Sequence, residues 1–247
     1  MPAVVEQAAP GVHRIGSGLV NVYLVEEDGR YTVVDGGLPS HFDQLLDLLE
    51  ALGADLHDVE AVVLTHGHRD NLGLVERVRT EAQARVLIHE ADAQMARTVK
   101  AIATDGQIAP YLWRPAALRY LAHTAPARKT PRVEDLTTFT DGTALDVPGR
   151  PTAVGTPGHT YGHTALHLPQ RGVLFAGDAL CSRNPLTGRH GPQLMPSALN
   201  ASTEQALASL DRIAQLDDAE TVLFAHGDPW RDGTAALVDR ARELAAS

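Results

Sequence analysis

The sequence has a single cysteine, Cys181, in 247 residues. A lone cysteine cannot form an internal disulfide, which excludes a disulfide-stapled secreted domain. No apolar run reaches the roughly 18 residues of a membrane-spanning helix, and residues 1–10 carry Glu6 but no basic leader before an apolar stretch. We therefore expect a cytoplasmic protein that spans no membrane.

Lysine is nearly absent, since Lys100 and Lys129 are the only two, and the formal net charge is -10. Proteins that track nucleic-acid phosphates usually present a basic face, so we expect no nucleic-acid partner. The acidic residues are spread along the chain, which is typical of a solubilising surface. A chain of this length with 44% hydrophobic residues can bury a substantial core, and we predict one domain over residues 1–247.

Hydrophobic periodicity predicts strands and helices in both halves of the chain. Strands are expected at 12–16, 20–26, 31–34, 61–64, 85–89, 144–147, 152–154, 164–168, 173–175 and 221–224. Helices are expected over about 40–52, with a leucine stripe that includes Leu46, and over 71–81, 90–99, 203–213 and 234–244. Strands that lead into helices in each half predict two packed sheets with helices outside, an α/β fold of the αββα sandwich type.

Residues 100–129 interrupt this pattern, because they mix prolines with Tyr111, Trp113 and Tyr120. One interpretation is a helical insertion beside the site, which would form a lid or a wall for the substrate. The other is a surface excursion that contacts a second copy of the chain in a homodimer. Both interpretations stay open.

The most informative motif is the heptapeptide Thr65–Asn71, THGHRDN, which directly follows the apolar run 61–64. His66 and His68 are one residue apart, and Asp70 lies two further on. The glycine between the histidines lets the chain turn sharply and brings both imidazoles to one side. The motif predicts a metal site at the end of a strand.

Three other predicted strands end in the same way, with a glycine and a histidine or an aspartate. His159 follows 152–154, Asp178 follows 173–175, and His226 follows 221–224. Ligands collect at strand ends in open sheets, and imidazoles and carboxylates are accepted by zinc, iron and manganese. A pattern that occurs four times predicts a shared metal centre.

Together these segments resemble the metallo-β-lactamase superfamily. Its pattern is H-x-H-x-D-H, a later histidine in a T-P-G-H-T context, an aspartate after a strand and a last histidine. The resemblance spans nearly the whole chain and implies the four-layer αββα sandwich of that family. It also implies two adjacent metal sites, one of His66, His68 and His159, and one of Asp70, His226 and a bridging Asp178.

The sequence departs from this pattern at Asn71, where the family has a histidine of the second site. An amide is a poor ligand for zinc compared with imidazole, and its carbonyl oxygen suits harder ions. The second site would bind weakly, bind another metal, use a water molecule, or stay empty. Asp70, Asp178 and His226 still supply three ligands, so we favour two ions. We expect one or two Zn²⁺ per chain, with iron or manganese as alternatives.

Other polar residues lie near these motifs. His163 matches a second histidine in the family's T-P-G-H-T-x-G-H loop, and we expect it to orient a ligand and not to bind metal. Arg189 and His190 lie in a predicted loop rich in glycine and proline. They would bind an anionic substrate, His190 would compensate for Asn71, or both are ordinary exposed residues.

The resemblance implies a metal-dependent hydrolase acting on a small-molecule ester, thioester or lactone. A metal ion held by neutral histidines lowers the pKa of bound water to roughly 7, and Asp70 would orient the resulting hydroxide and accept a proton. A weakened second site favours good leaving groups over amides. The alternatives are a mononuclear iron sulfur (persulfide) dioxygenase that uses His66, His159 and Asp178, and a non-catalytic binding protein on the same fold.

Overall fold

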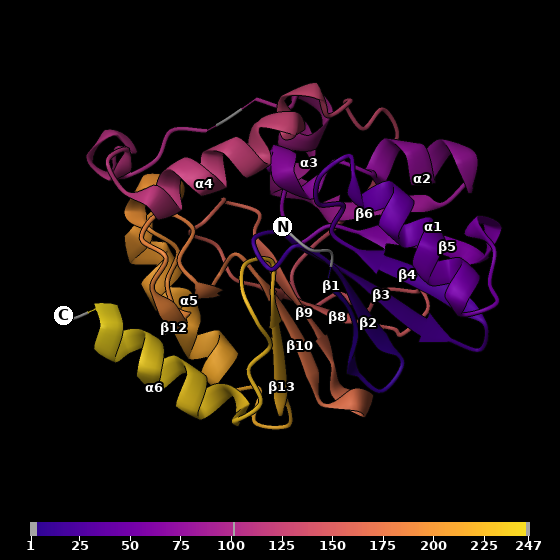
Figure 1. The fold of residues 1–247 in the computed structure, drawn as a ribbon. Coiled ribbons are helices and arrows are strands. Elements are labelled where there is room, and N and C mark those ends of the chain that lie inside the picture. The colour runs from indigo at the N-terminus through magenta and orange to yellow at the C-terminus, as the bar shows by residue number, and fades with distance from the viewer. Residues whose placement is uncertain (1–3, 101, 246–247) are drawn as a thin grey trace.

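Two β-sheets lie face to face between helices in the computed structural model, which describes residues 4–100 and 102–245 (Figure 1). An apolar cluster with residues from both sheets fills the space between them, and Tyr23 and Phe175 meet there with ring centroids 5.3 Å apart. Two further clusters join each sheet to its own helices. This is the predicted four-layer αββα sandwich.

The first sheet has seven strands, which pair in chain order. They are β1 (Val4–Ala9), β2 (Val12–Gly16), β3 (Asn21–Glu27), β4 (Arg30–Val34), β5 (Val59–Val63), β6 (Arg85–His89) and β7 (Thr137–Phe139). The turn between β3 and β4 has positive φ at Asp28 and Gly29, as a two-residue hairpin requires. From β4 to β7 the strands are parallel, so their carboxyl ends lie at one edge.

The second sheet has the order β13-β10-β9-β8. Its strands are β8 (Thr152–Gly155), β9 (Thr164–Leu168), β10 (Val173–Gly177) and β13 (Thr221–Phe224). Because β9 is antiparallel to both neighbours and β10 is parallel to β13, strands β8, β10 and β13 all end at the same edge. A two-stranded ribbon of β11 (Cys181–Arg183) and β12 (His190–Gln193) follows.

Helices cover the outer faces of both sheets (Figure 1). The first sheet packs against α1 (His41–Ala51), α2 (Val75–Glu81) and α3 (Glu90–Thr98), and the second against α5 (Thr203–Ala214) and α6 (Gly233–Ala245). In the part of the chain that is described, no helix has both the length and the apolar character needed to cross a membrane.

The segment 102–129 is mostly helical from Ala109 onward. It contains α4 (Pro115–Thr124) between two short 3-10 turns, η3 (Ala109–Tyr111) and η4 (Ala125–Lys129). Ala117 and Tyr120 on the inner side of α4 pack against Leu186 and Ala198, which come from the second half of the chain. The segment is therefore anchored across the edge at which the strands of both sheets end.

Several predicted elements differ from the structure. Residues 144–147 form no strand and make one isolated bridge at Ala144, although the apolar side chains around it do enter the core between the sheets. The helix predicted from residue 71 begins at Val75, because Arg69–Asn71 form a separate 3-10 turn, η2. Leu46, which was predicted to belong to the leucine stripe of this helix, is 38% exposed. Instead, α1 buries Phe42 against the first sheet. Strands β1, β7, β11 and β12 were not predicted.

Candidate metal centre

The predicted ligands lie on the loops that follow four strands. β5 leads to His66 and His68, β8 to His159, β10 to Asp178 and β13 to His226. Because these strands end at the facing edges of the two sheets, residues far apart in the sequence come together there. The apolar core fixes the strands, and the strands fix where each loop begins.

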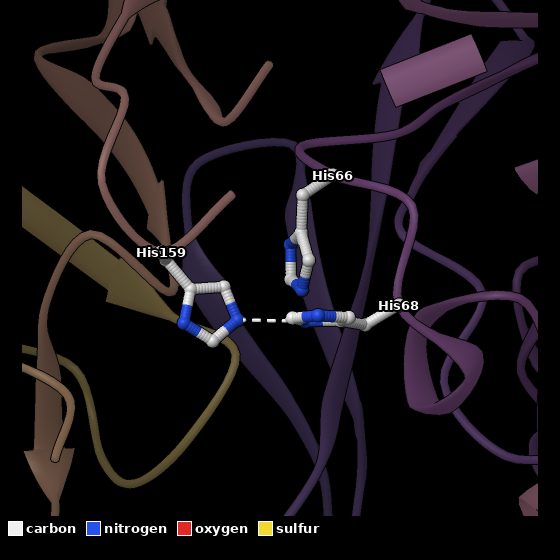
Figure 2. A group of neighbouring side chains, drawn as sticks. All are labelled: His66, His68 and His159. Carbon is white, nitrogen blue, oxygen red and sulfur yellow. Dashed lines mark hydrogen bonds between the residues drawn. The ribbon is translucent and has the colours of Figure 1, made fainter. Parts of the chain in front are cut away.

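His66, His68 and His159, called here the first cluster, offer three ring nitrogens that lie within 4.8 Å of one another. Figure 2 shows the three rings pointing toward one another from the two halves of the chain. Nδ1 of His68 lies 2.8 Å from Nε2 of His159. His66 and His159 are buried and His68 is half-buried. Three convergent imidazoles are a donor set typical of zinc and other divalent metals.

Asp178 lies between the first cluster and His226. Its Oδ2 atom is 3.1 Å from Nε2 of His159, 3.3 Å from Nε2 of His226 and 3.7 Å from Nε2 of His66. Its Oδ1 atom is buried and has no hydrogen-bond partner among the described residues. A buried carboxylate oxygen without a partner is costly, and a metal ion would satisfy it. The donor set therefore fits a metal ion.

The outer nitrogen, Nδ1, of each histidine around Asp178 is already engaged. For His66, His159 and His226 in turn, the partners are Thr65 Oγ1 at 3.0 Å, Asn200 Oδ1 at 3.3 Å and the carbonyl of Leu19. An acceptor at Nδ1 keeps the proton there and leaves the Nε2 lone pair for a metal. All three imidazoles are thus held in the tautomer that a ligand needs.

Asp35 determines that the Thr65 hydroxyl accepts a hydrogen bond from His66. It follows β4 and receives hydrogen bonds from the main-chain N–H of Thr65 at 2.9 Å and from the Thr65 hydroxyl at 2.9 Å. The hydroxyl proton is committed to Asp35, so the hydroxyl oxygen accepts from His66. Burial raises the pKa of Asp35 to about 7. Sequence reasoning missed this residue, although Asp35 follows an apolar strand and precedes a glycine, much as the predicted ligands do.

Asp92, on α3, joins the two histidine loops and was also missed. This buried carboxylate accepts from the N–H of Gly67 at 3.0 Å, the hydroxyl of Thr160 at 2.6 Å and the N–H of Gly162 at 2.8 Å. Gly67 is needed here for close approach, because a Cβ atom would come within 2.9 Å of Met95 on the same helix. An acid on the apolar face of a predicted helix was the available signal.

His163 binds the main-chain N–H of Asp178 through its ring. Its Nε2 accepts the N–H of Asp178 at 2.9 Å, and its Nδ1 lies 2.8 Å from the hydroxyl of Thr156. Burial lowers the pKa of His163 to about 3, so the ring is neutral and can accept. With both ring nitrogens engaged, His163 orients Asp178 and has no nitrogen left for a metal.

Asn71 is buried against the first cluster. Its amide nitrogen lies 2.9 Å from Nδ1 and 3.1 Å from Nε2 of His66. A hydrogen bond in the ring plane reaches one nitrogen only, so these nearly equal distances show that the amide packs against the ring. Asp70, on η2, accepts a hydrogen bond from the hydroxyl of Tyr120 at 2.8 Å.

Electrostatics separate the two ends of the site. Burial holds the pKa of His66 well below its usual value and lowers that of His68 to about 4. Burial also acts to lower the pKa of His226, but Asp178 outweighs it and raises this pKa to about 9. Burial acts to raise the pKa of Asp178, but His226 and His159 hold it well below its usual range. Asp178 is therefore ionised, and a metal ion bound at Nε2 of His226 would take the place of the proton that the raised pKa favours.

The sequence profile of the metallo-beta-lactamase superfamily matches residues 15–226. The chain belongs to this superfamily. Probable metallo-hydrolase YflN of Bacillus subtilis (strain 168) is 25% identical over 253 residues, which cover 90% of this chain and 86% of that protein.

Two further relatives of the superfamily are similar to this chain. The metallo-beta-lactamase family protein TTHA1429 from Thermus thermophilus superimposes with a TM-score of 0.68 at 30% identity, over 96% of this chain and 79% of that one. A hydroxyacylglutathione hydrolase of Synechococcus sp. (strain JA-3-3Ab) is 40% identical over 70 residues, 28% of this chain and 24% of that protein. The αββα fold is confirmed, and the chain is an enzyme of this superfamily of metallo-hydrolases.

In this metallo-β-lactamase fold, a cavity of about 230 Å³ adjoins the metal centre. His68 and Asp70 line it together with Val99 and Leu199. Arg69 and Lys100 line it as well, so the cavity has an apolar side and two cationic side chains next to the proposed ligands.

Arg189 and His190 lie elsewhere. His190 begins strand β12, where a loop was predicted; its side chain is exposed and it pairs in register with Arg183. Arg189 lines a separate cavity of about 690 Å³ together with Tyr111 and Arg114, and none of the predicted metal ligands lines that cavity. The structure therefore does not bring these two residues to the histidines.

Proposed function

We propose that this enzyme hydrolyses a small-molecule thioester or lactone, with ordinary esters as further substrates. The observation that carries the proposal is the convergence of Nε2 of His66, His159 and His226 on one oxygen of Asp178, with every outer nitrogen anchored. The first cluster would hold one Zn²⁺, and Asp70, Asp178 and His226 a second. When bound, the metal supplies a Lewis acid and a water of lowered pKa.

The chain's own residues supply positioning and proton transfer. Asp70 is half-buried and lines the 230 Å³ cavity, so its carboxylate can orient a water molecule there and hold the proton that the water loses. Val99 and Leu199 give that cavity an apolar side next to the proposed ligands.

The substitution at Asn71 supports the choice of substrate class. The amide packs against His66 and takes no ligand position of its own, so we propose a second metal ion that binds more weakly than the first. Less stabilisation of the leaving group favours thioesters and lactones over amides. The name of the Synechococcus relative, hydroxyacylglutathione hydrolase, describes release of an acyl group from glutathione and supports the same class.

One observation favours a second candidate function. His66, His159 and Asp178 form a group of two histidines and one carboxylate, a ligand set used by mononuclear iron oxygenases. A sulfur dioxygenase acting on a persulfide would use this group alone. His68, which is in contact with His159, favours the three-histidine arrangement and hence hydrolysis.

Metal analysis and a substrate panel test the proposal together. We expect near two metal ions per chain, with zinc dominant, and faster turnover of thioesters and lactones than of amides. Asn71→His should tighten the second ion. Faster amide hydrolysis would contradict the substrate class, and iron together with oxygen uptake on a persulfide would replace the hydrolase by the dioxygenase.

We also propose that residues 1–247 form one domain, that the protein is cytoplasmic, and that it binds neither nucleic acid nor membranes. A net charge of -10 supports the absence of nucleic-acid binding. A homodimer through the 102–129 segment is supported by the exposed Leu112, Trp113 and Leu118. Light scattering of the full chain tests the dimer, and a monomer at micromolar concentration would refute it.

A further inference from the structure

Tyr120, on α4, reaches the metal centre from outside both sheets. Its side chain is 7% exposed. Its hydroxyl donates to Oδ2 of Asp70 at 2.8 Å, and its ring meets His226 edge-on with centroids 5.6 Å apart. Both contacts are with proposed ligands of the second metal ion. Over the described ranges, no hydrogen bond or ring contact joins Tyr120 to the first cluster.

The hydrogen bond has a fixed direction. An ionised carboxylate only accepts, so the phenol of Tyr120 donates and occupies one side of Oδ2 of Asp70. It is the one hydrogen bond to the Asp70 carboxylate among the residues that the structure describes. Asp70 lies on η2, a turn of three residues, and not at the end of a strand. The orientation of its carboxylate therefore depends on Tyr120.

A second link joins α4 to the same end of the site. One turn beyond Tyr120, Nε2 of His123 lies 2.7 Å from the hydroxyl of Ser17. That hydroxyl accepts from the main-chain N–H of Leu19, whose carbonyl in turn accepts from Nδ1 of His226. Helix α4 thus supports His226 in two ways, through the ring of Tyr120 and through the loop between β2 and β3.

We propose that Tyr120 is the positioning residue for the second metal ion, through its hydroxyl on Asp70 and its ring on His226. Asn71 is engaged with the ring of His66, so it does not restrain Asp70 through its side chain. Tyr120 contacts Asp70 and His226 together. The inference rests on the second metal ion of the proposed function.

Zinc titration of the full chain tests this inference. Metal-stripped wild type and Tyr120→Phe are titrated with Zn²⁺ against a chromophoric chelator. The variant keeps the ring and loses only the hydroxyl. We expect two binding steps in the wild type, and in the variant a second step weakened by about 10- to 100-fold, the usual cost of losing a partner of a metal ligand, with the first step unchanged.

Tyr111→Phe is the matched control, because it makes the same change in the same segment at a residue that lines the separate 690 Å³ cavity. Both zinc steps should stay unchanged there. A single step in the wild type overturns the inference, as do two unchanged steps or equal weakening of both steps in Tyr120→Phe. Hydrolysis assays on the same samples keep the proposals apart: no turnover with the zinc steps as expected refutes the hydrolase and leaves Tyr120 in its role.

Discussion

The two ends of the metal centre are built differently. In the first cluster, His66 and His159 lie three and four residues beyond strands β5 and β8 and are fixed at Nδ1 by Thr65 and Asn200. At the other end, Asp70 lies on a three-residue turn and is held by a helix from a distant segment. His66, His159 and His226 thus lie close to strand ends, whereas Asp70 depends on a tertiary contact with α4.

This difference separates two ways of positioning a ligand. A ligand at the end of a strand is positioned by the pairing of the whole sheet, so its place is determined once the strand is formed. A ligand on a short turn needs a partner. Asn71 stands in the second kind of region, where Tyr120 and α4 provide such a partner.

Removing a ligand of the first cluster should have the largest effect. His159→Ala takes away one of three convergent imidazoles and leaves Oδ2 of Asp178 without its nearest partner. We expect loss of the tightly bound metal and a fall in kcat/KM of roughly a thousandfold or more, the scale of losing an essential group. Metal analysis and thioester hydrolysis measure both. Retention of a full metal complement would contradict the ligand assignment.

Lowering the pH should destabilise the fold through a group other than the proposed metal ligands. His41, at the start of α1, has its pKa lowered from the ordinary value of 6.5 to about 4, mainly by burial. Its folded form resists protonation, so the stability it contributes is present above pH 6.5 and lost as pH falls toward 4. The loss is roughly 3 kcal/mol.

Urea unfolding of the metal-stripped protein at about pH 7 and about pH 4 measures this loss. In His41→Asn the difference between the two pH values should shrink by roughly 3 kcal/mol. An unchanged pH dependence would show that His41 is not the group responsible.

Weakening the hydrogen bonds by which Asp92 joins the loops of His66 and His159 should have an intermediate effect. Asp92→Asn keeps the shape of the side chain, but one amide group replaces an oxygen that accepts hydrogen bonds. We expect the first metal ion to bind about 10- to 100-fold more weakly and the free energy of unfolding to fall by about 1–3 kcal/mol. Asp47→Asn, on the exposed side of α1, is the control. Equal effects of the two substitutions would show that Asp92 does not hold the two histidine loops together.

The smallest effect is expected at His190, which one interpretation of the sequence made a substitute for the histidine absent at position 71. Its side chain is exposed on β12. His190→Ala should therefore leave metal content unchanged and kcat/KM within about twofold, as for surface substitutions in general. A loss of the second metal ion in this variant would show that His190 does compensate for Asn71. The end of the site that holds Asp70 would then depend on His190 as well as on Tyr120.

Local signals in the sequence, together with the family resemblance, were enough to predict the fold, and they nominated a set of candidate ligands. Apolar strands that end in glycine with histidine or aspartate are visible without any tertiary information, and they led to His66, His159, Asp178 and His226. The supporting residues were not visible in this way. Asp35, Asp92 and Asn200 lie 30, 25 and 41 positions from the residues that they hold, and such separations carry no periodic signal.

The tight turn at Asp28-Gly29 and the strand at 164–168 were determined by the sequence itself, because turn geometry and strand formation depend on the conformational preferences of neighbouring residues. The pairing of Tyr120 with Asp70 was decided only by the tertiary structure. A phenol and a carboxylate 50 positions apart meet because α4 packs on Leu186 and Ala198, and hydrogen bonds depend on distance in space.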